Sequence, residues 1–256
     1  ARWPEVSASD VESEERREVD VGDLLDRAEE QVRQGRVDGE LLDAVRRLKP
    51  EDAKYLVDRL EKRILRYNEW HRVGERAWRA LSKVEDAAMP RLIDYVRQVA
   101  GVDVPLKARR GWTDKVKELI KDITVESFEE ARRRGMDEYA VPLVGDDYTR
   151  AIVRWERFRE ILKYVPAQNL LDRQNDSPLF IDFVEAAASV PGSYINMYVI
   201  GKLRDDERVT IDGVILPIQP EAGDVVWRLQ HNAIEAPDEV MFIEVKGRQY
   251  IWLWWD

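Results

Sequence analysis

The spacing of apolar residues changes once along this chain, and the change limits the possible folds more than any other feature. Before about residue 190, apolar residues recur every three or four positions, as they do on the buried side of a helix. After Pro191-Gly192 they alternate or form short β-branched and aromatic runs, which are typical of strands. The sequence therefore predicts an α+β fold, mainly α, with a multi-helix N-terminal two-thirds and a small antiparallel C-terminal unit.

The chain divides into four predicted regions. Residues 1–20 are polar and acidic, and we expect a flexible arm there. Residues 21–104 are predicted to form a helical domain that contains a basic helix. A loop with Pro105 then leads to a second helical region, residues 111–190. Residues 191–256 are predicted to form a small β unit with one short helix.

Helix boundaries follow from glycine, proline and capping residues. Gly35 should end the first helix, and Pro50 should begin a long one with acidic residues in its first turn. The apolar stripe of that long helix rotates near residues 68–71, which predicts either a bend or two different packing partners. Pro90 is predicted to begin a separate helix, and Asp146-Asp147 to cap another that extends to about Val165.

Two hairpins are predicted in the β unit, with a helix over residues 224–232 between them. The first spans 208–218 around Asp212-Gly213, a strong hairpin signal. The second spans 239–255 around Lys246-Gly247. The expected order of elements is therefore ββαββ.

The composition adds constraints on stability and chemistry. Charged residues make up 36% of the chain, against about 25% in typical globular domains. Asn and Gln are sparse and cysteine is absent, a combination typical of thermophilic proteins. The absence of cysteine excludes disulfides, thiolate metal sites and a cysteine nucleophile. No apolar run reaches the roughly 18 residues of a membrane span, and no secretion signal is visible, so we expect a cytoplasmic protein.

One segment is basic although the whole chain carries a net charge of −10. Basic side chains gather at helical spacing on both sides of the predicted bend, and more follow in a later loop. They are Arg59, Lys62, Arg63 and Arg66, then Arg72, Arg76, Arg79 and Lys83, and finally Lys107, Arg109 and Arg110. Such an array can bind the phosphates of a nucleic acid. The alternative is that it pairs with the protein's own carboxylates.

A Glu-x-Lys triplet lies near the C-terminal end, at Glu244 and Lys246. On a strand these two side chains share a face. With Asp212 upstream, the outline resembles a Mg²⁺-dependent nuclease in two short patches. The resemblance implies that Asp212 and Glu244 bind Mg²⁺ while Lys246 orients the attacking water. The alternative is an ordinary pair of hairpins, in which Asp212 and Lys246 belong to tight turns.

The chain ends in an aromatic run, YIWLWW, at residues 250–255. Alternating residues of a strand face opposite sides, and both sides of this run are apolar. The run is therefore either a core strand covered on both faces or a strand that keeps one face for a partner. The candidate interface residues are Tyr250, Trp252, Trp254 and Trp255.

The leading hypothesis is a non-enzymatic binding or assembly protein that acts through the basic helix and the aromatic hairpin. Its expected partners are another protein or a second copy, with nucleic acid as a further candidate. The alternative is the Mg²⁺-dependent nuclease. His71 and His231 lack metal-ligand spacing, and there is no glycine-rich nucleotide loop, so the sequence indicates no cofactor and no metal site.

Overall fold

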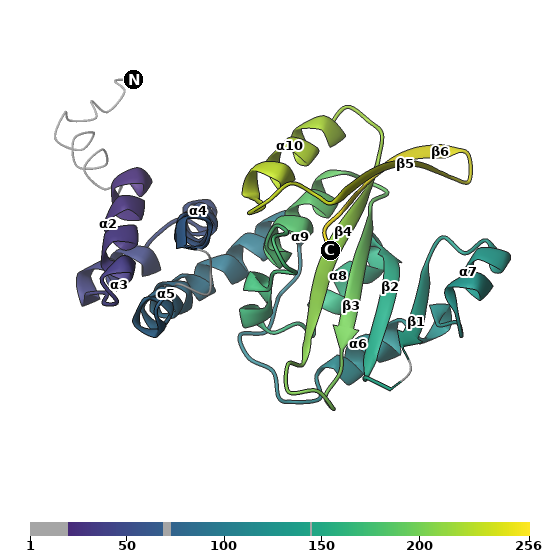
Figure 1. Ribbon diagram of the computed structural model, residues 1–256, viewed down its shortest axis with the longest axis horizontal. Helices are drawn as coiled ribbons and strands as arrows, with labels where there is room; N and C mark the ends of the chain where they lie inside the picture. The colour runs from purple at the N-terminus through teal and green to yellow at the C-terminus, as the bar shows by residue number, and fades with distance from the viewer. Residues whose placement is uncertain (1–19, 69–72, 144) are drawn as a thin grey trace, which may run out of the picture. The chain divides into compact units, whose positions relative to one another are not determined.

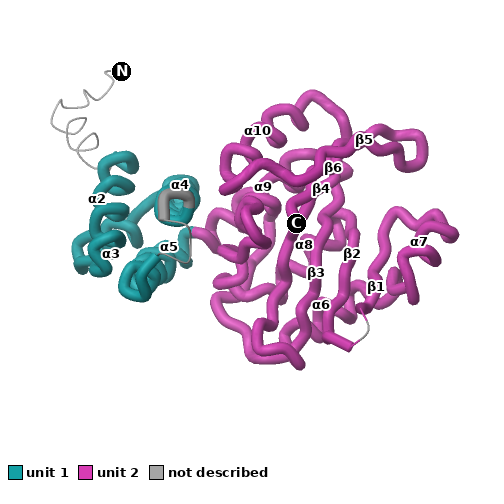
Figure 2. The backbone as a smooth tube through the Cα atoms, in the orientation of Figure 1, with its two compact units in different colours: residues 1–91 teal, residues 92–256 magenta. Residues whose placement is uncertain are grey.

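The computed structural model describes residues 20–68, 73–143 and 145–256, so almost all of the predicted N-terminal arm lies outside the described residues. Within that part of the chain, helices and one antiparallel sheet form a mixed α+β structure (Figure 1), which confirms the predicted class. The chain divides into two compact units (Figure 2): unit 1, residues 1–91, and unit 2, residues 92–256.

Unit 1 is helical. It contains α2 (Val21–Arg33), α3 (Gly39–Arg46), α4 (Pro50–Asn68) and the first part of α5 (Glu75–Ala100). Helices α2, α3 and α4 each have an apolar stripe, and the stripes supply the buried core of this unit. Its largest fully buried side chains are Leu25, Leu41, Leu56, Leu60, Ile64 and Leu81. On α4, Leu56, Leu60 and Ile64 are spaced four residues apart, which is the pattern from which this helix was predicted.

The end of α2 shows why glycine occupies position 35. Gly35 has φ of 73°, a left-handed conformation in which other residues are strained. A Cβ atom at this position would also lie only 2.7 Å from the Cβ of Arg76. The predicted stop is therefore confirmed, and it serves a close approach as well as a turn.

Two helix predictions in this region were wrong. The basic segment does not form one bent helix, because α4 ends at Asn68 and α5 begins at Glu75. Residues 69–72, where the bend was predicted, lie outside the described residues. Pro90 does not begin a helix but lies inside α5. A proline there costs one backbone hydrogen bond, yet the buried residues Ala88 and Leu92 continue the apolar face across it.

Unit 2 is built on one sheet in which every neighbouring pair of strands is antiparallel. The strand order is β1-β2-β3-β4-β6-β5. The strands are β1 (Tyr139–Leu143), β2 (Tyr148–Arg154), β3 (Tyr194–Ile200), β4 (Arg208–Pro217), β5 (Glu239–Val245) and β6 (Arg248–Trp254). The strands after residue 191 thus do not form a sheet of their own, because β1 and β2 extend the same sheet.

The helices of unit 2 are short and mostly cover one face of this sheet. They are α6 (Thr113–Leu119), α7 (Phe128–Arg134), α8 (Trp155–Leu162), α9 (Phe180–Ser189) and α10 (Ala222–Asn232), with 3-10 turns at Lys121–Ile123 and Ala167–Leu171. Helices α6, α8 and α9 contact β2, β3 and β4 (Figure 1). The strand residues on that face, such as Ala151, Met197 and Val214, are fully buried.

The helix predicted from Asp147 to Val165 was wrong in its first half. Residues 148–154 form strand β2, and the helix α8 begins only at Trp155. Tyr148 and Ile152 are four residues apart, a spacing that fits one face of a helix and also one face of a strand. Asp147 does not cap a helix; it lies in the β1–β2 turn with φ of 46°.

The turn predicted at Asp212-Gly213 was also wrong. Strand β4 continues through both residues, and neither has a positive φ. Met197 pairs with Ile211, whereas Asn196 pairs with Gly213, so Asp212 is the extra residue of a β-bulge. An Asp-Gly pair also suits a bulge, where one additional residue disturbs the ladder. The bulge places Asp212 inside the structure, with 2% of its surface exposed.

The sheet is curled toward the face that lacks helices. A flat sheet of this width would separate its two edge strands by about 24 Å. Tyr139 on β1 and Val245 on β5 nevertheless pack against one cluster of Ile152, Tyr194, Ile215 and Tyr250. The β5–β6 turn also reaches the segment before β1, where Lys246 donates to Asp137 at 3.2 Å. We call this side the concave face.

Candidate binding surfaces

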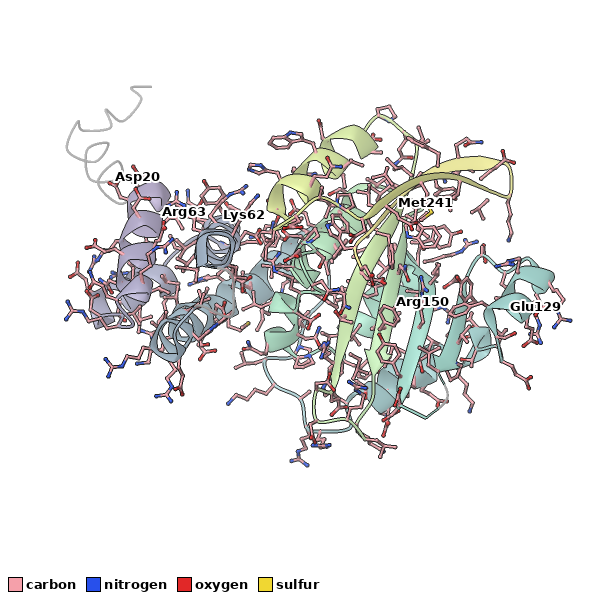
Figure 3. All side chains as sticks on the ribbon, viewed as in Figure 1. Asp20, Lys62, Arg63, Glu129, Arg150 and Met241 are labelled. Carbon is pink, nitrogen blue, oxygen red and sulfur yellow. The ribbon has the colours of Figure 1, made fainter. Side chains whose placement is uncertain are left out.

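The basic residues of unit 1 are in part already paired with the protein's own carboxylates. Arg63 on α4 donates to Asp26 at 2.6 Å and to Glu29 at 3.0 Å, both on α2. These two bonds raise the pKa of Arg63, and the bond to Asp26 contributes most. Figure 3 shows Lys62 and Arg63 side by side on α4. Arg63 therefore fits the alternative interpretation, in which the basic array pairs with the protein's own carboxylates.

The other members of the array vary in what surrounds them. Arg79 pairs with Glu75 one turn earlier on α5. The Arg59 guanidinium lies over the Tyr55 ring, 5.4 Å from its centre, and Lys62 also has a partner. Arg76 and Lys83 are exposed. The side chains of Arg66 and Arg72 are not among those described.

The predicted extension of the array lies in unit 2. Lys107, Arg109 and Arg110 are exposed on the loop before α6. Arg110 donates to the carbonyl oxygens of Lys202 and Arg204, at 2.8 and 3.2 Å, and so ties this loop to the β3–β4 connection. Arg110 therefore has a structural role. For Lys107 and Arg109, no side-chain partner among the described residues indicates a role.

The structure does not bring the predicted nuclease residues together. Gly213 pairs with Trp254, whereas Glu244 pairs with Gln249, so about 17 Å of strand separates Glu244 from the position beside Asp212. Alternation also puts Glu244 on the opposite face of the sheet from Trp254, which binds Asp212.

Lys246 is accounted for by the hairpin turn. Lys246 and Gly247 have φ of 50° and 79°, the pattern of a two-residue turn with left-handed residues. Among the residues that the structure describes, no group of three or more His, Asp or Glu side chains is placed to hold a metal ion. No site for the Mg²⁺ of the alternative hypothesis is therefore assembled around Asp212.

The aromatic run divides between core and surface. Trp255 is 1% exposed; its indole packs edge-on against Phe183 and donates to the carbonyl oxygen of Glu235 at 3.1 Å. Tyr250 is buried in the cluster of the concave face. Trp252 and Trp254 are half-buried on that same face. Of the four predicted interface residues, two are therefore core residues and two line a partly accessible surface.

The hairpin has a second, outer surface at the edge of the sheet. Strand β5 is the last strand in the order and, among the described strands, pairs with β6 alone. Its residues Phe242 and Val240 are 71% and 47% exposed. Their side chains face away from the concave face, because they alternate with Met241 and Ile243. The edge therefore combines apolar side chains with backbone groups that no described strand pairs.

The concave face also contains residues that the sequence analysis did not select. Tyr148 and Tyr198 stack with ring centres 4.8 Å apart. The guanidinium of Arg150, which is labelled in Figure 3, lies 5.7 Å from the Tyr198 ring centre. Trp254 Nε1 donates to Asp212 at 2.8 Å. Burial raises the pKa of Asp212 to about 6, although this bond, Arg150 and Tyr198 act in the opposite direction.

A sequence signal for these residues existed. Tyr148, Arg150, Ile152 and Arg154 alternate with Thr149, Ala151 and Val153, which is the period of a strand with one buried face. The helix prediction for this segment hid that alternation. The pairing of β2 with β3 could not be predicted, because it joins residues that are far apart in the chain.

Comparisons with known proteins give no further guide. The chain matches no family model, no curated protein and no solved structure. None of the helices in the described ranges is long and apolar enough to cross a membrane. The function must therefore be inferred from the surfaces themselves.

Proposed function

We propose that this protein is a non-enzymatic assembly protein that pairs with a second copy of itself through strand β5. The observation that carries the proposal is the edge position of a seven-residue strand with Phe242 71% exposed. Folded proteins usually shorten, charge or cover such an edge, because it attracts other strands. An uncovered apolar edge therefore supports a role in association.

The backbone of β5 offers a defined pattern for pairing. In a hairpin with a two-residue turn, the pair next to the turn, Val245 and Arg248, faces inward. Alternation then directs the N–H and C=O groups of Val240, Phe242 and Glu244 outward from β6. These groups can bond a partner strand without any change in the existing sheet.

A second copy fits this edge better than an unrelated strand. In the antiparallel register that overlaps all of β5, Phe242 lies opposite Phe242 of the copy. Val240 then faces Glu244, and Asp238 faces Lys246, so the ends of the pairing carry opposite charges. A two-fold axis repeats each of these contacts, as in most homodimers. The apolar rings at the centre and the charges at the ends favour this register.

The basic residues support a weaker proposal, that the assembly also contacts nucleic acid. Lys83 and Arg76 in unit 1 are exposed, and Lys107 and Arg109 are exposed in unit 2. Contacts of this kind would track the phosphate backbone and weaken steeply with salt. The pairing of Arg63 and Arg79 with carboxylates makes nucleic acid the less favoured partner.

The charge networks support the proposal that the protein is heat-adapted. Arg27 pairs with Asp38 and Glu40, which links α2 to α3. Arg157 pairs with Asp122 and Glu138. Networks of this kind contribute more at high temperature than isolated pairs do. We expect a melting temperature above about 65 °C, the upper end of the range typical of mesophilic domains.

Light scattering coupled to gel filtration tests the self-association. The wild-type protein should elute with twice the mass of one chain, and Phe242→Lys should elute as a monomer. Trp227→Lys is the matched control, because Trp227 is an exposed aromatic residue, 63% accessible, on α10 rather than on β5. A wild-type monomer, or a dimer that Phe242→Lys leaves intact, would contradict the proposal.

A further inference from the structure

The concave face contains a buried polar group without a partner. Asn196 on β3 is fully buried, and neither its side-chain oxygen nor its nitrogen has a hydrogen-bond partner among the described residues. The indole nitrogen of Trp252 is also buried and has no hydrogen-bond partner among the described residues. Buried amides are nearly always hydrogen-bonded, because removing them from water is unfavourable. Two such groups in one place therefore indicate a site that a ligand completes.

The two groups are neighbours on the sheet. Asn196 pairs with Gly213, and Gly213 pairs with Trp254, so all three residues lie in one row across β3, β4 and β6. A Cβ atom on Gly213 would lie 3.2 Å from the Trp252 Nε1 and 3.5 Å from the Asn196 Cβ. Glycine at 213 thus leaves the Trp252 ring against the strand, beside Asn196. Movement of that ring would expose the Asn196 amide to a ligand.

Asp212 precedes Gly213, which belongs to this row, and supplies a carboxyl group. One of its oxygens accepts from Trp254 Nε1. The other makes no bond of good geometry to a described group, although the Tyr198 hydroxyl also interacts with this carboxyl group. The half-buried Tyr148–Tyr198 stack and Arg150 lie on the same face. The face thus offers an acceptor, an amide with both a donor and an acceptor, a guanidinium group and flat aromatic rings.

We propose that this face binds a guanine base, as a free nucleoside. Guanine presents two adjacent N–H donors, which a carboxylate accepts, beside a carbonyl oxygen, which an amide or guanidinium donates to. Its ring can stack on Tyr198 or Trp254 as bases stack on aromatic side chains in nucleic-acid complexes. The ligand would satisfy the Asn196 amide and bond the second Asp212 oxygen together.

The proposal does not depend on pairing through β5, because Phe242 and Val240 face the other side of the sheet. Several groups act on the Asp212 carboxyl group. Arg150 and Tyr148 lie on β2 and Tyr198 on β3, and Trp254 on β6 is a neutral donor. Since the pKa of Asp212 is raised to about 6, its ionised form is available at neutral pH and scarce below pH 5. Guanine binding should weaken accordingly as the pH falls.

Intrinsic tryptophan fluorescence can measure the binding, because Trp252 and Trp254 are part of the site. Guanosine should quench the signal saturably at about pH 8, and the affinity should fall roughly tenfold or more at about pH 5. Inosine, which lacks the 2-amino group, should bind more weakly than guanosine. Adenosine, which has no N–H at the equivalent ring position, should bind more weakly still.

Variants separate a specific site from general stacking. Asp212→Asn should lower the affinity for guanosine by roughly tenfold or more, because one acceptor becomes a donor. Tyr148→Ala should also weaken binding. Tyr148 is half-buried, so its truncation should disturb the fold less than a change at the buried Asp212. Trp227→Ala on α10 should leave it unchanged. Circular dichroism establishes that each variant is folded. Absence of quenching by guanosine, equal affinity for adenosine, or unchanged binding to folded Asp212→Asn and Tyr148→Ala would each overturn the proposal.

Discussion

Units 1 and 2 differ in how their buried polar side chains are paired. In unit 1, Lys54 and Asp58 are both buried on α4 and pair at 2.7 Å, and Arg63 joins α4 to α2 through two carboxylates. In unit 2, the concave face buries the Asn196 amide, which bonds no group among the described residues, beside the Asp212 carboxyl group. A buried carboxylate that is paired with a cation has less capacity for a ligand than an amide with an unused donor and acceptor. We therefore expect the ion pairs of unit 1 to contribute mainly to stability, and the proposed binding site lies in unit 2.

The largest expected effect comes from breaking the buried pair of unit 1. Lys54→Met removes the ammonium group that pairs with the Asp58 carboxylate, and Asp58 is only 4% exposed. We expect a loss of about 3–5 kcal/mol in the free energy of unfolding, because removing one partner of a buried ion pair is costly. Urea denaturation measures this loss. The double variant Lys54→Met, Asp58→Leu should recover most of it, and failure to recover would show that the pair itself is not the cause.

The pH dependence of stability tests Asp212 in unit 2. Its pKa in the folded protein is about 6, above the ordinary value of 3.8, because burial disfavours the charged form. The folded state thus holds this proton more tightly than the unfolded state. The stability that Asp212 contributes is complete below about pH 4 and is lost as the pH rises through about 6, by on the order of 2–3 kcal/mol.

The difference between wild type and Asp212→Asn isolates this effect. Other carboxyl groups have the opposite slope; the pKa of Asp206, for example, is lowered to about 2, chiefly by its bond from Arg204. Urea denaturation from about pH 4 to 8 measures the unfolding free energy of both proteins. Subtracting the value for the variant from that for wild type should cancel the contribution of the other carboxyl groups. A difference that does not change with pH would mean that Asp212 is not protonated in this window.

A substitution at Asn196 tests whether the buried amide of unit 2 is unsatisfied in the folded protein. Asn196→Leu replaces an unsatisfied buried amide with an apolar side chain of similar size. We expect the free energy of unfolding to rise by about 1–3 kcal/mol, since the desolvation cost of the amide disappears. Guanosine binding should be lost in the same variant. A marked loss of stability in urea denaturation would instead show that the Asn196 amide is satisfied in the folded protein.

The smallest effect is expected for the exposed charges of unit 1. Arg63 is 37% exposed, so its pairs with Asp26 and Glu29 are screened by water. Arg63→Ala should lower the free energy of unfolding by about 0–1 kcal/mol, and Arg79→Ala by less. Thermal denaturation at low and high salt measures both. A loss above 2 kcal/mol would show that Arg63 has a packing role that these pairs do not explain.

The helices of unit 1 could be predicted because their signals are local. Gly35 and Pro50 mark helix ends through their own backbone preferences, and apolar residues at helical spacing form the core. The prediction failed at Pro90, where packing on both sides of the proline sustains α5. It failed again at Tyr148–Arg154, because a spacing of four residues fits both a helix and a strand.

The sequence by itself determined the α+β class, the second hairpin with its Lys246-Gly247 turn, and the helix ends at glycine. Each of these depends on residues that are neighbours in the chain. Only the tertiary structure decided that β1 and β2 join the later strands and that Asp212 is a buried bulge residue. It also decided that Asn196, Trp252 and Tyr148 share one face. The physical reason is that strand pairing joins distant segments, and no local preference specifies which strand will lie beside another.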